Sequence, residues 1–431
     1  MNRGCSIFFY EGYVGISPTI VNTAKVLSEE GYIITIYGTK NDYPPPGELG
    51  ERVQILYFRK AARILAAIKK KWPEIVPVLE LFIYTIQCCL HLLKNRKKTD
   101  IKINIAVDIY GALAALIVYF LFKQNYLFLS LELHEPEYIF KGAAKSLTRL
   151  AKLACQKSRG LIIQDEDRFK TFCQYYSSQP ERVFYLPNST LAAPENETIQ
   201  KNYFREKFNL SEEEFPHLIL QAGMISDAVY SFALAKAFTE IENCALIFHE
   251  RQLRRETDPD IQALRQINSK NLFLSLEPLP YDEVDKIYTA PTIGLAFYAD
   301  IGNNFSQISM ASGKLPQYLK WGKPILVNDL PSLSQLVEKY QCGIVIKNPS
   351  DGKEIKTAIE HIVSYYANYS RNAKACFAAE FDFSKKMQPI LDFIKTFPSP
   401  NPGFNPDKTS NQCSKTSLYC SKSKETITGK H

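Results

Sequence analysis

The stretch that decides the fold is Ser312-Gly313-Lys314-Leu315-Pro316-Gln317-Tyr318-Leu319-Lys320-Trp321-Gly322-Lys323-Pro324-Ile325-Leu326-Val327. Ser312 can cap a short helix, Gly322 ends it, and an apolar strand follows. The first turn of such a helix offers free backbone N–H groups and the positive end of the helix dipole. Gly313 permits close approach to the backbone, and Lys314 adds positive charge. These residues suit a diphosphate, although Ser-Gly before a helix is also an ordinary turn and cap.

Apolar runs of strand length alternate with helical patterns along the rest of the chain, which indicates β-α-β units and parallel sheets. The predicted strands are 5–10, 32–37, 53–58, 101–107, 126–133, 160–163 and 183–186, then 218–222, 244–248, 272–274, 293–296, 324–327 and 343–346. We therefore predict an α/β protein with two Rossmann-like domains.

A polar connection divides the two sets of strands and sets the predicted domain limits. The N-terminal domain is expected at 1–188, a linker at 189–202 and the C-terminal domain at 203–375. A helical pattern of apolar residues falls within 376–397. Residues 398–431 are rich in Pro, Ser, Asn, Lys and Thr, and such a segment cannot bury enough apolar surface to order itself, so we expect a disordered tail.

The amino-acid composition of the chain limits the kinds of partner that we expect it to bind. The chain has 431 residues, 45% of them hydrophobic, and its net charge of +7 is spread among nearly as many acids. No long basic stripe follows from this pattern, so nucleic acid is not the expected partner. The ten cysteines have irregular spacing, which is typical of a reduced, cytoplasmic protein and not of a metal framework. The first strand starts close to Met1, so no secretory leader is predicted.

The most apolar window, 76–93, is interrupted by Glu80, Gln87 and His91, which disfavours a membrane span. Basic residues flank it, and the whole 69–98 region could lie on an anionic membrane surface. The flanking residues are Lys69, Lys70, Lys71, Lys94, Arg96, Lys97 and Lys98. A surface helix docked on the protein beside solvated lysines explains the same pattern.

The 312–327 stretch closely resembles the donor-site motif of retaining GT-B glycosyltransferases of the group-1 or family 4 type. The matching residues are Lys314, Leu315, Tyr318, Gly322, Lys323 and Pro324. The resemblance implies two Rossmann-like domains facing a cleft, with the donor diphosphate held at Ser312, Gly313, Lys314 and Leu315. It also implies a ribose contact from Gln317 and a second contact from Ser309, at positions where the family carries acids.

Other segments resemble the same family. Glu11, Gly12 and Gly15 stand where such enzymes carry a Gly-rich loop that faces the acceptor, although an ordinary β-to-α turn has the same residues. His134 follows a predicted strand and looks like the family's cleft histidine, which contacts the transferred sugar. A hydrogen-bonded structural histidine is the alternative. The helix in 376–397 is implied to return to the N-terminal domain.

Gly223 matches the glycine that opens the family's C-terminal domain, but the Arg and Lys that usually follow it are missing here. Arg251, at the end of the next predicted strand, is the best substitute for binding donor phosphates. A surface salt bridge between Arg251 and Glu250 is the competing explanation.

The resemblance implies transfer of a sugar from a UDP- or GDP-sugar to an acceptor hydroxyl, with catalytic roles for His134 and Gln317. Retention, no metal and no cofactor are implied, because the nucleotide-sugar is itself a substrate and no Asp-x-Asp pair is suitably placed. The acceptor is expected to be a carbohydrate or lipid-linked, within surface polysaccharide or glycolipid synthesis, in the cytoplasm or at the inner face of the cell membrane. Two alternatives stay open: a non-catalytic GT-B homologue that binds a sugar nucleotide or partner, and a nucleotide-sugar epimerase of the same fold.

Overall fold

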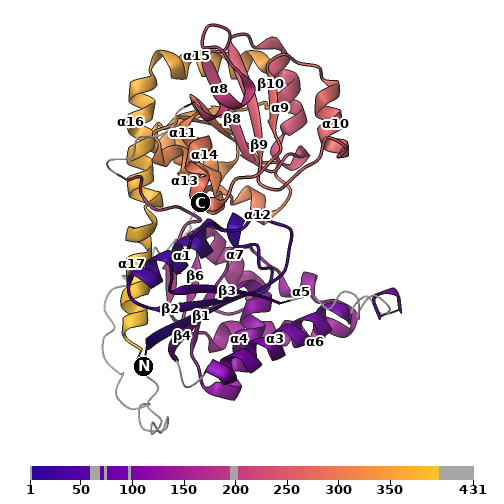
Figure 1. The fold of residues 1–431 in the computed structure, drawn as a ribbon, viewed down its shortest axis with the longest axis vertical. Coiled ribbons are helices and arrows are strands. Elements are labelled where there is room, and N and C mark those ends of the chain that lie inside the picture. Colours follow the sequence, from indigo (N-terminus) through magenta and orange to yellow (C-terminus); the bar gives the residue numbers. More distant parts are fainter. Residues whose placement is uncertain (1, 59–67, 72–74, 96–98, 195–201, 398–431) are drawn as a thin grey trace, which may run out of the picture.

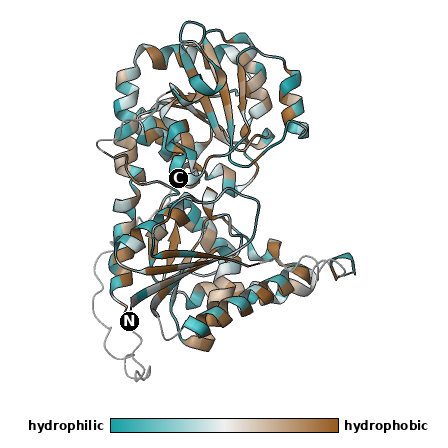
Figure 2. Cartoon of the chain, viewed as in Figure 1, coloured by the Kyte–Doolittle hydropathy of each residue, from teal (hydrophilic) through white to brown (hydrophobic). Residues whose placement is uncertain are grey.

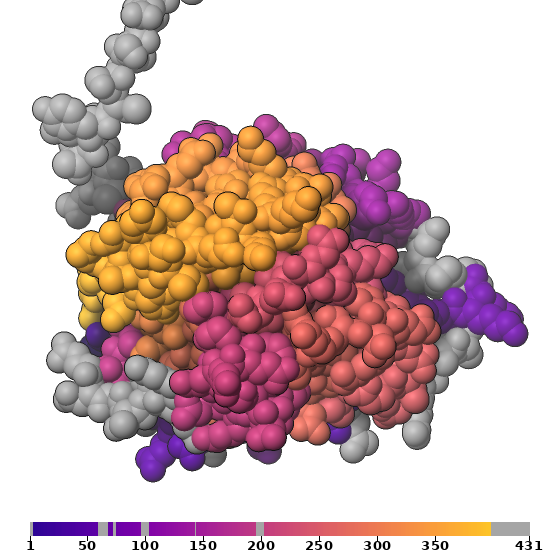
Figure 3. Space-filling model, turned by 90° about the horizontal axis from the view of Figure 1, so that it is seen from above, coloured from indigo at the N-terminus to yellow at the C-terminus, as the bar shows by residue number. Residues whose placement is uncertain are grey.

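The computed structural model describes residues 2–58, 68–71, 75–95, 99–194 and 202–397. They form two α/β domains that meet across a cleft, with the N-terminal domain below and the C-terminal domain above in Figure 1. Helices α16 (Tyr366–Cys376) and α17 (Phe383–Lys395) run along one side of both domains (Figure 1). Seen from above, the C-terminal domain hides most of the N-terminal domain (Figure 3). The predicted tail at 398–431 lies outside the described residues.

The N-terminal sheet has seven parallel strands in the order β3-β2-β1-β4-β5-β6-β7. Their bounds are β1 Asn2–Phe9, β2 Ile33–Thr39, β3 Val53–Phe58, β4 Thr99–Val107, β5 Tyr126–Leu129, β6 Leu161–Ile163 and β7 Val183–Tyr185. The order reverses between β1 and β4, and such a reversal opens a crevice at the carboxyl ends of the strands.

Helices cover both faces of this sheet, and the longer ones bury apolar side chains in its core. They are α1 Pro18–Glu29, α3 Val76–Asn95, α4 Asp108–Phe122, α5 Pro136–Ile139, α6 Ser146–Lys157 and α7 Glu166–Tyr176. One core cluster joins the sheet to α3, α4, α6 and α7, and a second joins it to α1 and α17. The cleft-forming edge is therefore carried on a sheet that is packed from both sides.

The C-terminal sheet repeats the design with six parallel strands in the order β10-β9-β8-β11-β12-β13. Its strands are β8 His217–Gly223, β9 Cys244–Glu250, β10 Leu272–Ser275, β11 Ile293–Ala296, β12 Ile325–Asn328 and β13 Gly343–Ile346. The remaining helices are α8 Tyr203–Phe208, α9 Ser231–Ala237, α10 Pro259–Gln266, α11 Asp285–Thr289, α12 Asn303–Ser306, α13 Lys314–Lys320, α14 Pro331–Tyr340 and α15 Gly352–Ser364. Apolar clusters fill both sides of this sheet as well.

The chain crosses back to the N-terminal domain after α16. A π-helical turn, Phe377–Phe381, separates α16 from α17, and the Ser189 hydroxyl donates to the Phe381 carbonyl at that turn. Helix α17 then packs on α1 and β7. Its buried side chains are Phe383, Met387, Ile390, Leu391 and Ile394, all within the second N-terminal core cluster. The two domains thus share their last helix.

One predicted strand is too long. The 126–133 run forms a strand only as far as Leu129, and the next residues form a loop that enters the cleft. After Leu129 the backbone N–H groups bond to side chains and not to a neighbouring strand. Asp108 accepts from the N–H groups of Leu131 and Glu132, and Asn304 accepts from that of Leu133. The loop is therefore held open beside the sheet edge.

Candidate functional site

The cleft between the domains has a volume of about 530 Å³ and is lined by residues of both. It opens at the carboxyl ends of the parallel strands, where ligands bind in open α/β sheets. The sequence-predicted residues that line it are Gly15, His134, Gly223, Arg251, Ser312, Gly313, Lys314 and Gln317. The fold thus brings the 312–317 segment together in one cleft with Gly15, His134, Gly223 and Arg251, which lie far from it in the sequence.

Lys314, the first residue of α13, is the main charge on the C-terminal wall. Its side chain is buried, and among the described residues its Nζ has no hydrogen-bond partner. The Nζ lies 4.9 Å from the centre of the Tyr298 ring, and a Cβ at Gly223 would come within 3.8 Å of it. Burial and, to a smaller extent, the nearby positive charge of Arg251 together lower the pKa of Lys314 to about 7. A buried, unpaired ammonium facing a cleft is a site for an anion.

Arg251 stands beside Lys314, immediately after β9. Its exposed side chain lines the cleft. The neighbouring carboxylate of Glu250 accepts the backbone N–H groups of Ile225 (3.0 Å) and Arg251 (3.0 Å) and lies 3.7 Å from Arg254 Nη1. Glu250 therefore fixes the loop after β8, and Arg254 is its charged partner. This arrangement leaves the Arg251 guanidinium facing the cleft with Lys314.

Two further residues predicted to bind the donor, Gln317 and Ser309, have neutral side chains. Gln317 is buried and lines the cleft, and its Oε1 has no hydrogen-bond partner among the described residues. Ser309 is also buried, and its Oγ is likewise without a partner in the described structure, but it is not among the residues that line the cleft. Buried polar atoms normally find partners, so these two oxygens can receive hydrogen bonds from a ligand or water. They are neutral where the family carries acids.

Ser312 and Gly313 join α13 to the domain interface. The Ser312 hydroxyl contacts the Tyr298 hydroxyl at 2.5 Å and accepts from the Leu315 N–H at 3.4 Å. A Cβ at Gly313 would lie 3.3 Å from Asn188 Nδ2 and 3.6 Å from Pro18 Cγ. Gly313 therefore allows the C-terminal domain to close on the N-terminal one, besides lining the cleft.

His134 lies on the opposite wall, in the loop that follows β5. Its Nε2 is 3.9 Å from Asp108 Oδ2. Asp108 begins α4 with a φ of 52°, and its Oδ1 accepts from the N–H groups of Leu131 (2.7 Å) and Glu132 (3.1 Å). Burial raises the pKa of Asp108 to about 7, opposed by these two hydrogen bonds and by Arg168. Burial lowers the pKa of His134, while the charge of Glu132 raises it.

Glu132, in the same loop as His134, places a carboxylate on the cleft wall. It is open to the cleft, yet the surrounding protein limits its hydration and raises its pKa, while Arg168 acts in the opposite direction. Glu132, His134 and Asp108 thus form a titratable group on the N-terminal wall, facing the cationic pair on the C-terminal wall.

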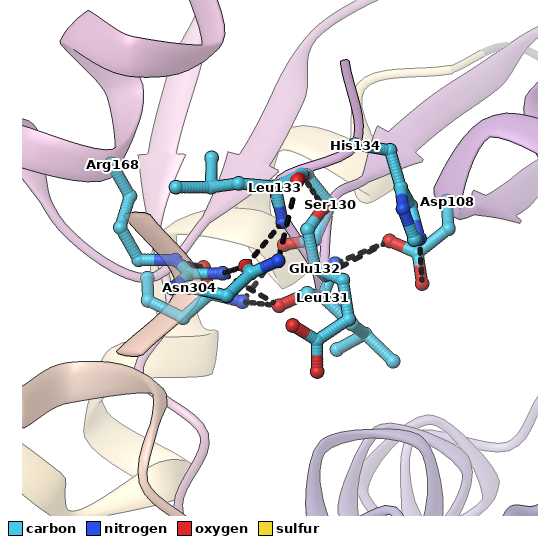
Figure 4. Close-up of polar contacts among 9 residues, drawn as sticks. Asp108, Ser130, Leu131, Glu132, Leu133, His134, Arg168 and Asn304 are labelled. Carbon is cyan, nitrogen blue, oxygen red and sulfur yellow. Dashed lines mark hydrogen bonds and ion pairs between the residues drawn. The ribbon is translucent and has the colours of Figure 1, made fainter. Parts of the chain in front are cut away.

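Arg168 of the same domain and Asn304 from across the interface hold the His134 loop, as Figure 4 shows. Arg168 is fully buried in α7, where Asp165 caps the helix by accepting from the Arg168 N–H. Its guanidinium donates to Gln164 Oε1 (2.7 Å), to the Leu131 carbonyl (3.1 Å) and to Asn304 Oδ1 (3.0 Å). Asn304 Oδ1 also accepts from the Leu133 N–H at 2.7 Å. The loop is therefore positioned by residues of both domains.

Other predicted residues have a structural role. Leu315 is fully buried in the C-terminal core, where it supports α13. Gly12 has a φ of 72°, and a Cβ there would lie 2.2 Å from the Thr39 carbonyl oxygen, so the turn after β1 requires glycine. The Glu11 carbonyl accepts from Asn41 Nδ2 at 3.2 Å within the same turn. Gly15, although it lines the cleft, also packs against the backbone of Pro44.

Sequence reasoning missed Asp108, Glu132, Arg168 and Asn304. Asp108 follows a predicted strand directly, so its position at the carboxyl edge was a usable signal. Glu132 and Asn304 carry no local pattern of this kind. Arg168 has the sequence of an exposed first helical turn, and its burial depends on α12 of the other domain.

Neither a protein-family model nor a curated protein matches this sequence. Solved structures do match it. Sucrose-phosphate synthase from Thermosynechococcus elongatus has a TM-score of 0.65 at 12% identity, over 91% of this chain and 98% of that one. HepE from Anabaena, in complex with UDP and glucose, has a TM-score of 0.63 at 13% identity, over 91% and 99%. WaaG, a glycosyltransferase involved in lipopolysaccharide biosynthesis, has a TM-score of 0.59 at 13% identity, over 91% and 100%.

These likenesses establish the fold. The chain has the GT-B architecture, with two Rossmann-like domains and parallel sheets facing a cleft, and the predicted fold class is confirmed.

Proposed function

We propose that this chain is a glycosyltransferase that moves a sugar from a nucleotide-sugar donor, a UDP- or GDP-sugar, to an acceptor hydroxyl. The observation that carries the proposal is Lys314, whose buried ammonium faces the cleft without a partner among the described residues, beside Gly223 and Arg251. A diphosphate leaving group supplies the negative charge that this wall lacks.

The reaction follows from that placement. The acceptor oxygen forms a bond to the anomeric carbon while the bond from that carbon to the diphosphate oxygen breaks. The electron pair leaves with the nucleoside diphosphate, and the acceptor's proton is released. Lys314 and Arg251 stabilise the charge that develops on the leaving group, which supports a metal-independent reaction. Gln317 offers its unpartnered Oε1 to donor hydroxyls, and His134 faces the transferred sugar from the other wall. Retention of configuration is part of the proposal on the family resemblance.

The acceptor is proposed to be a carbohydrate or a lipid-linked molecule, in surface polysaccharide or glycolipid synthesis. WaaG, which has the same fold and is involved in lipopolysaccharide biosynthesis, supports this choice of acceptor. HepE, solved with UDP, with UDP-glucose and with UDP and glucose, supports a nucleotide-sugar donor. We place the reaction in the cytoplasm, at the inner face of the cell membrane, with no cofactor besides the donor itself.

A second candidate is a non-catalytic homologue that binds a sugar nucleotide without turnover. The neutral Ser309 and Gln317 favour it, because a carboxylate would hold donor hydroxyls more strongly than either side chain. Both candidates require the same cationic wall and differ only in whether the donor is consumed.

Calorimetric titration with UDP-, GDP- and ADP-sugars tests donor binding, and release of free nucleotide with and without acceptors tests turnover. Lys314→Ala should weaken donor binding by about 1.5 to 3 kcal/mol, roughly 10- to 150-fold in Kd. Lys236→Ala removes an exposed lysine of α9 and serves as the matched control. Normal binding by Lys314→Ala would place the donor elsewhere. Binding without nucleotide release would select the non-catalytic alternative.

A further inference from the structure

Helix α3 presents an apolar row to solvent. Phe82, Ile86, Leu90 and Leu93 are 59%, 41%, 61% and 52% exposed, and their spacing places them on one side of the helix. The opposite side buries Leu81, Tyr84, Cys88 and Leu92 in the N-terminal core. Helix α3 is thus apolar on the face that the protein covers and also on the face that it leaves open.

The open row continues on the neighbouring helices. Helix α4 packs between α3 and α6, and it exposes Ile117, Phe120 and Leu121 at its C-terminal end. Leu150 is exposed on α6. The three helices lie together on one side of the N-terminal domain, and Figure 2 shows brown, hydrophobic residues along them. We call this surface, made of the eight exposed apolar residues named here, the outer face. Surface patches of this kind mark interaction sites.

Charge on the outer face has one sign. Exposed basic residues stand among its apolar ones: Lys94 at the end of α3, Lys123 after α4, and Arg149 and Lys157 on α6. The described parts of α3, α4 and α6 contain two acids, Glu80 and Asp108. Glu80 accepts a hydrogen bond from the Tyr10 hydroxyl, and Asp108 is buried at the cleft. The outer face therefore combines apolar side chains with unopposed positive charge.

The length and composition of α3 would also suit a membrane-spanning helix, but the packing of α3 excludes that role. By length and composition α3 is the one helix of the described chain that could cross a membrane, and 33% of its apolar window is buried inside the protein. Its core contacts hold it lengthwise against the N-terminal sheet. It can therefore lie on a bilayer with its open side, but it cannot cross one while the domain is folded.

We propose that the outer face binds the surface of an anionic lipid membrane. Phe82, Leu90 and Phe120 would enter the headgroup boundary, while the basic residues meet lipid phosphates. A second copy of the chain is a poorer occupant, because a symmetric pairing would oppose like charges. The inference rests on the proposed function in one respect: it explains how a lipid-linked acceptor reaches the N-terminal side of the cleft.

Flotation of the full chain with vesicles tests this inference directly. Vesicles of phosphatidylcholine alone are compared with vesicles containing phosphatidylglycerol, without any sugar nucleotide, so the result is separate from donor binding. We expect binding to the anionic vesicles only, and loss of that binding at high salt. The double variant Leu90→Glu/Phe120→Glu should reduce partitioning by about tenfold or more. Leu253→Glu, a leucine 65% exposed on the C-terminal domain, is the matched control and should bind normally.

A charge variant keeps the test decisive if the apolar variant folds poorly. Arg149→Glu changes an exposed residue and should weaken binding to anionic vesicles by at least about fivefold. Absence of vesicle binding by the wild type, or equal binding by the wild type and both variants, would overturn the proposal. Sedimentation of the chain without vesicles tests whether a second copy binds the outer face instead. A dimer that dissociates in the Leu90→Glu/Phe120→Glu variant would show that it does.

Discussion

Asn304 of the C-terminal domain binds both backbone groups of Leu133 in the N-terminal domain: its Oδ1 accepts from the Leu133 N–H at 2.7 Å, and its Nδ2 donates to the Leu133 carbonyl at 3.3 Å. The same amide oxygen accepts from Arg168 at 3.0 Å. Because His134 is the next residue, the position of its ring depends on how the two domains meet.

Asn304→Ala should therefore lower turnover by about tenfold or more while donor Kd changes little, since misplacing a group near the reacting atoms costs rate more than binding. Asn303→Ala, which removes the neighbouring exposed contact with the Tyr175 hydroxyl, is the matched control. Nucleotide release and calorimetry separate the two effects. Equal losses in both variants would assign Asn304 a general role in domain contact and not in positioning the loop.

Arg168→Met should lower the free energy of unfolding by about 2 to 4 kcal/mol, because it leaves the buried Gln164 Oε1 without its donor and removes one of the two donors to the Leu131 carbonyl. Urea unfolding measures this loss. The double variant with Asn304→Ala should lose less than the sum of the single losses, because the two residues share a hydrogen bond. Strict additivity would show that Arg168 and Asn304 act independently.

Lys314 should make donor binding depend on pH. Its pKa is about 7 in the free protein, so the binding form is lost as the pH rises, whereas a bound anion raises that pKa again. Kd should therefore increase above pH 7, by up to about tenfold per pH unit, with proton uptake on binding. Calorimetry in buffers of different ionisation enthalpy detects the uptake. Lys314→Arg should remove this dependence, and its persistence in that variant would implicate another group.

Lys314→Met should raise the stability of the donor-free protein while it impairs donor binding. The folded pKa lies below the unfolded value of 10.5, so the wild type gains stability from Lys314 deprotonation as the pH rises from about 7 to 10.5. At neutral pH the variant should gain about 1 to 4 kcal/mol, the range found when buried charges are replaced by apolar side chains. Thermal unfolding with and without donor measures both changes, and a destabilised variant would contradict the cost assigned to the buried ammonium.

Asp108→Asn should flatten the pH dependence of stability in acid. The folded pKa of Asp108 is raised to about 7 from a reference of 3.8, so its contribution is complete below about 3.8 and is lost as the pH rises to 7. Asparagine keeps an oxygen for the Leu131 and Glu132 N–H groups but does not ionise. Urea unfolding between pH 4 and about pH 7 tests this, and parallel curves for both proteins would show that Asp108 does not titrate there.

Gln317→Glu should preserve or tighten donor binding, because its Oε1 is already without a partner at the cleft and a carboxylate accepts donor hydroxyls more strongly. Calorimetry with a recognised donor is the measurement. Weaker binding by this variant would show that Gln317 does not hold donor hydroxyls.

The sequence predicts the fold better than it predicts the site. Every predicted strand appears, because each buried strand is a continuous apolar run between turn residues, and Val53–Phe58, Ile293–Ala296 and Gly343–Ile346 match to the residue. The 312–327 motif also leads to the cleft, because a helix start and a strand are encoded locally. The return of the last helix was implied by the resemblance, and its apolar pattern agrees with the packing of α17.

Apart from His134 and Gly15, the N-terminal wall of the site could not be predicted from local patterns. Arg168 carries the charge of an exposed residue, but it is fully buried against Gln164 and Leu131 of its own domain and Asn304 of the other. The loop at Leu131 and Leu133 has the composition of a strand, and its departure from the sheet depends on Asp108 and Asn304, which are distant in sequence. Such features arise from contacts between elements, and a local pattern does not record them.

The return of α17 to the first domain has a consequence for synthesis on the ribosome. The N-terminal core contains Phe383, Met387 and Ile394, which emerge long after Leu186 of the same cluster. At ordinary translation rates, the roughly 200 intervening residues take about 10 to 40 s. During that interval the nascent first domain exposes the apolar groove that α17 will fill. A ribosome stalled before α17 should therefore display a chaperone-binding surface that the finished protein conceals.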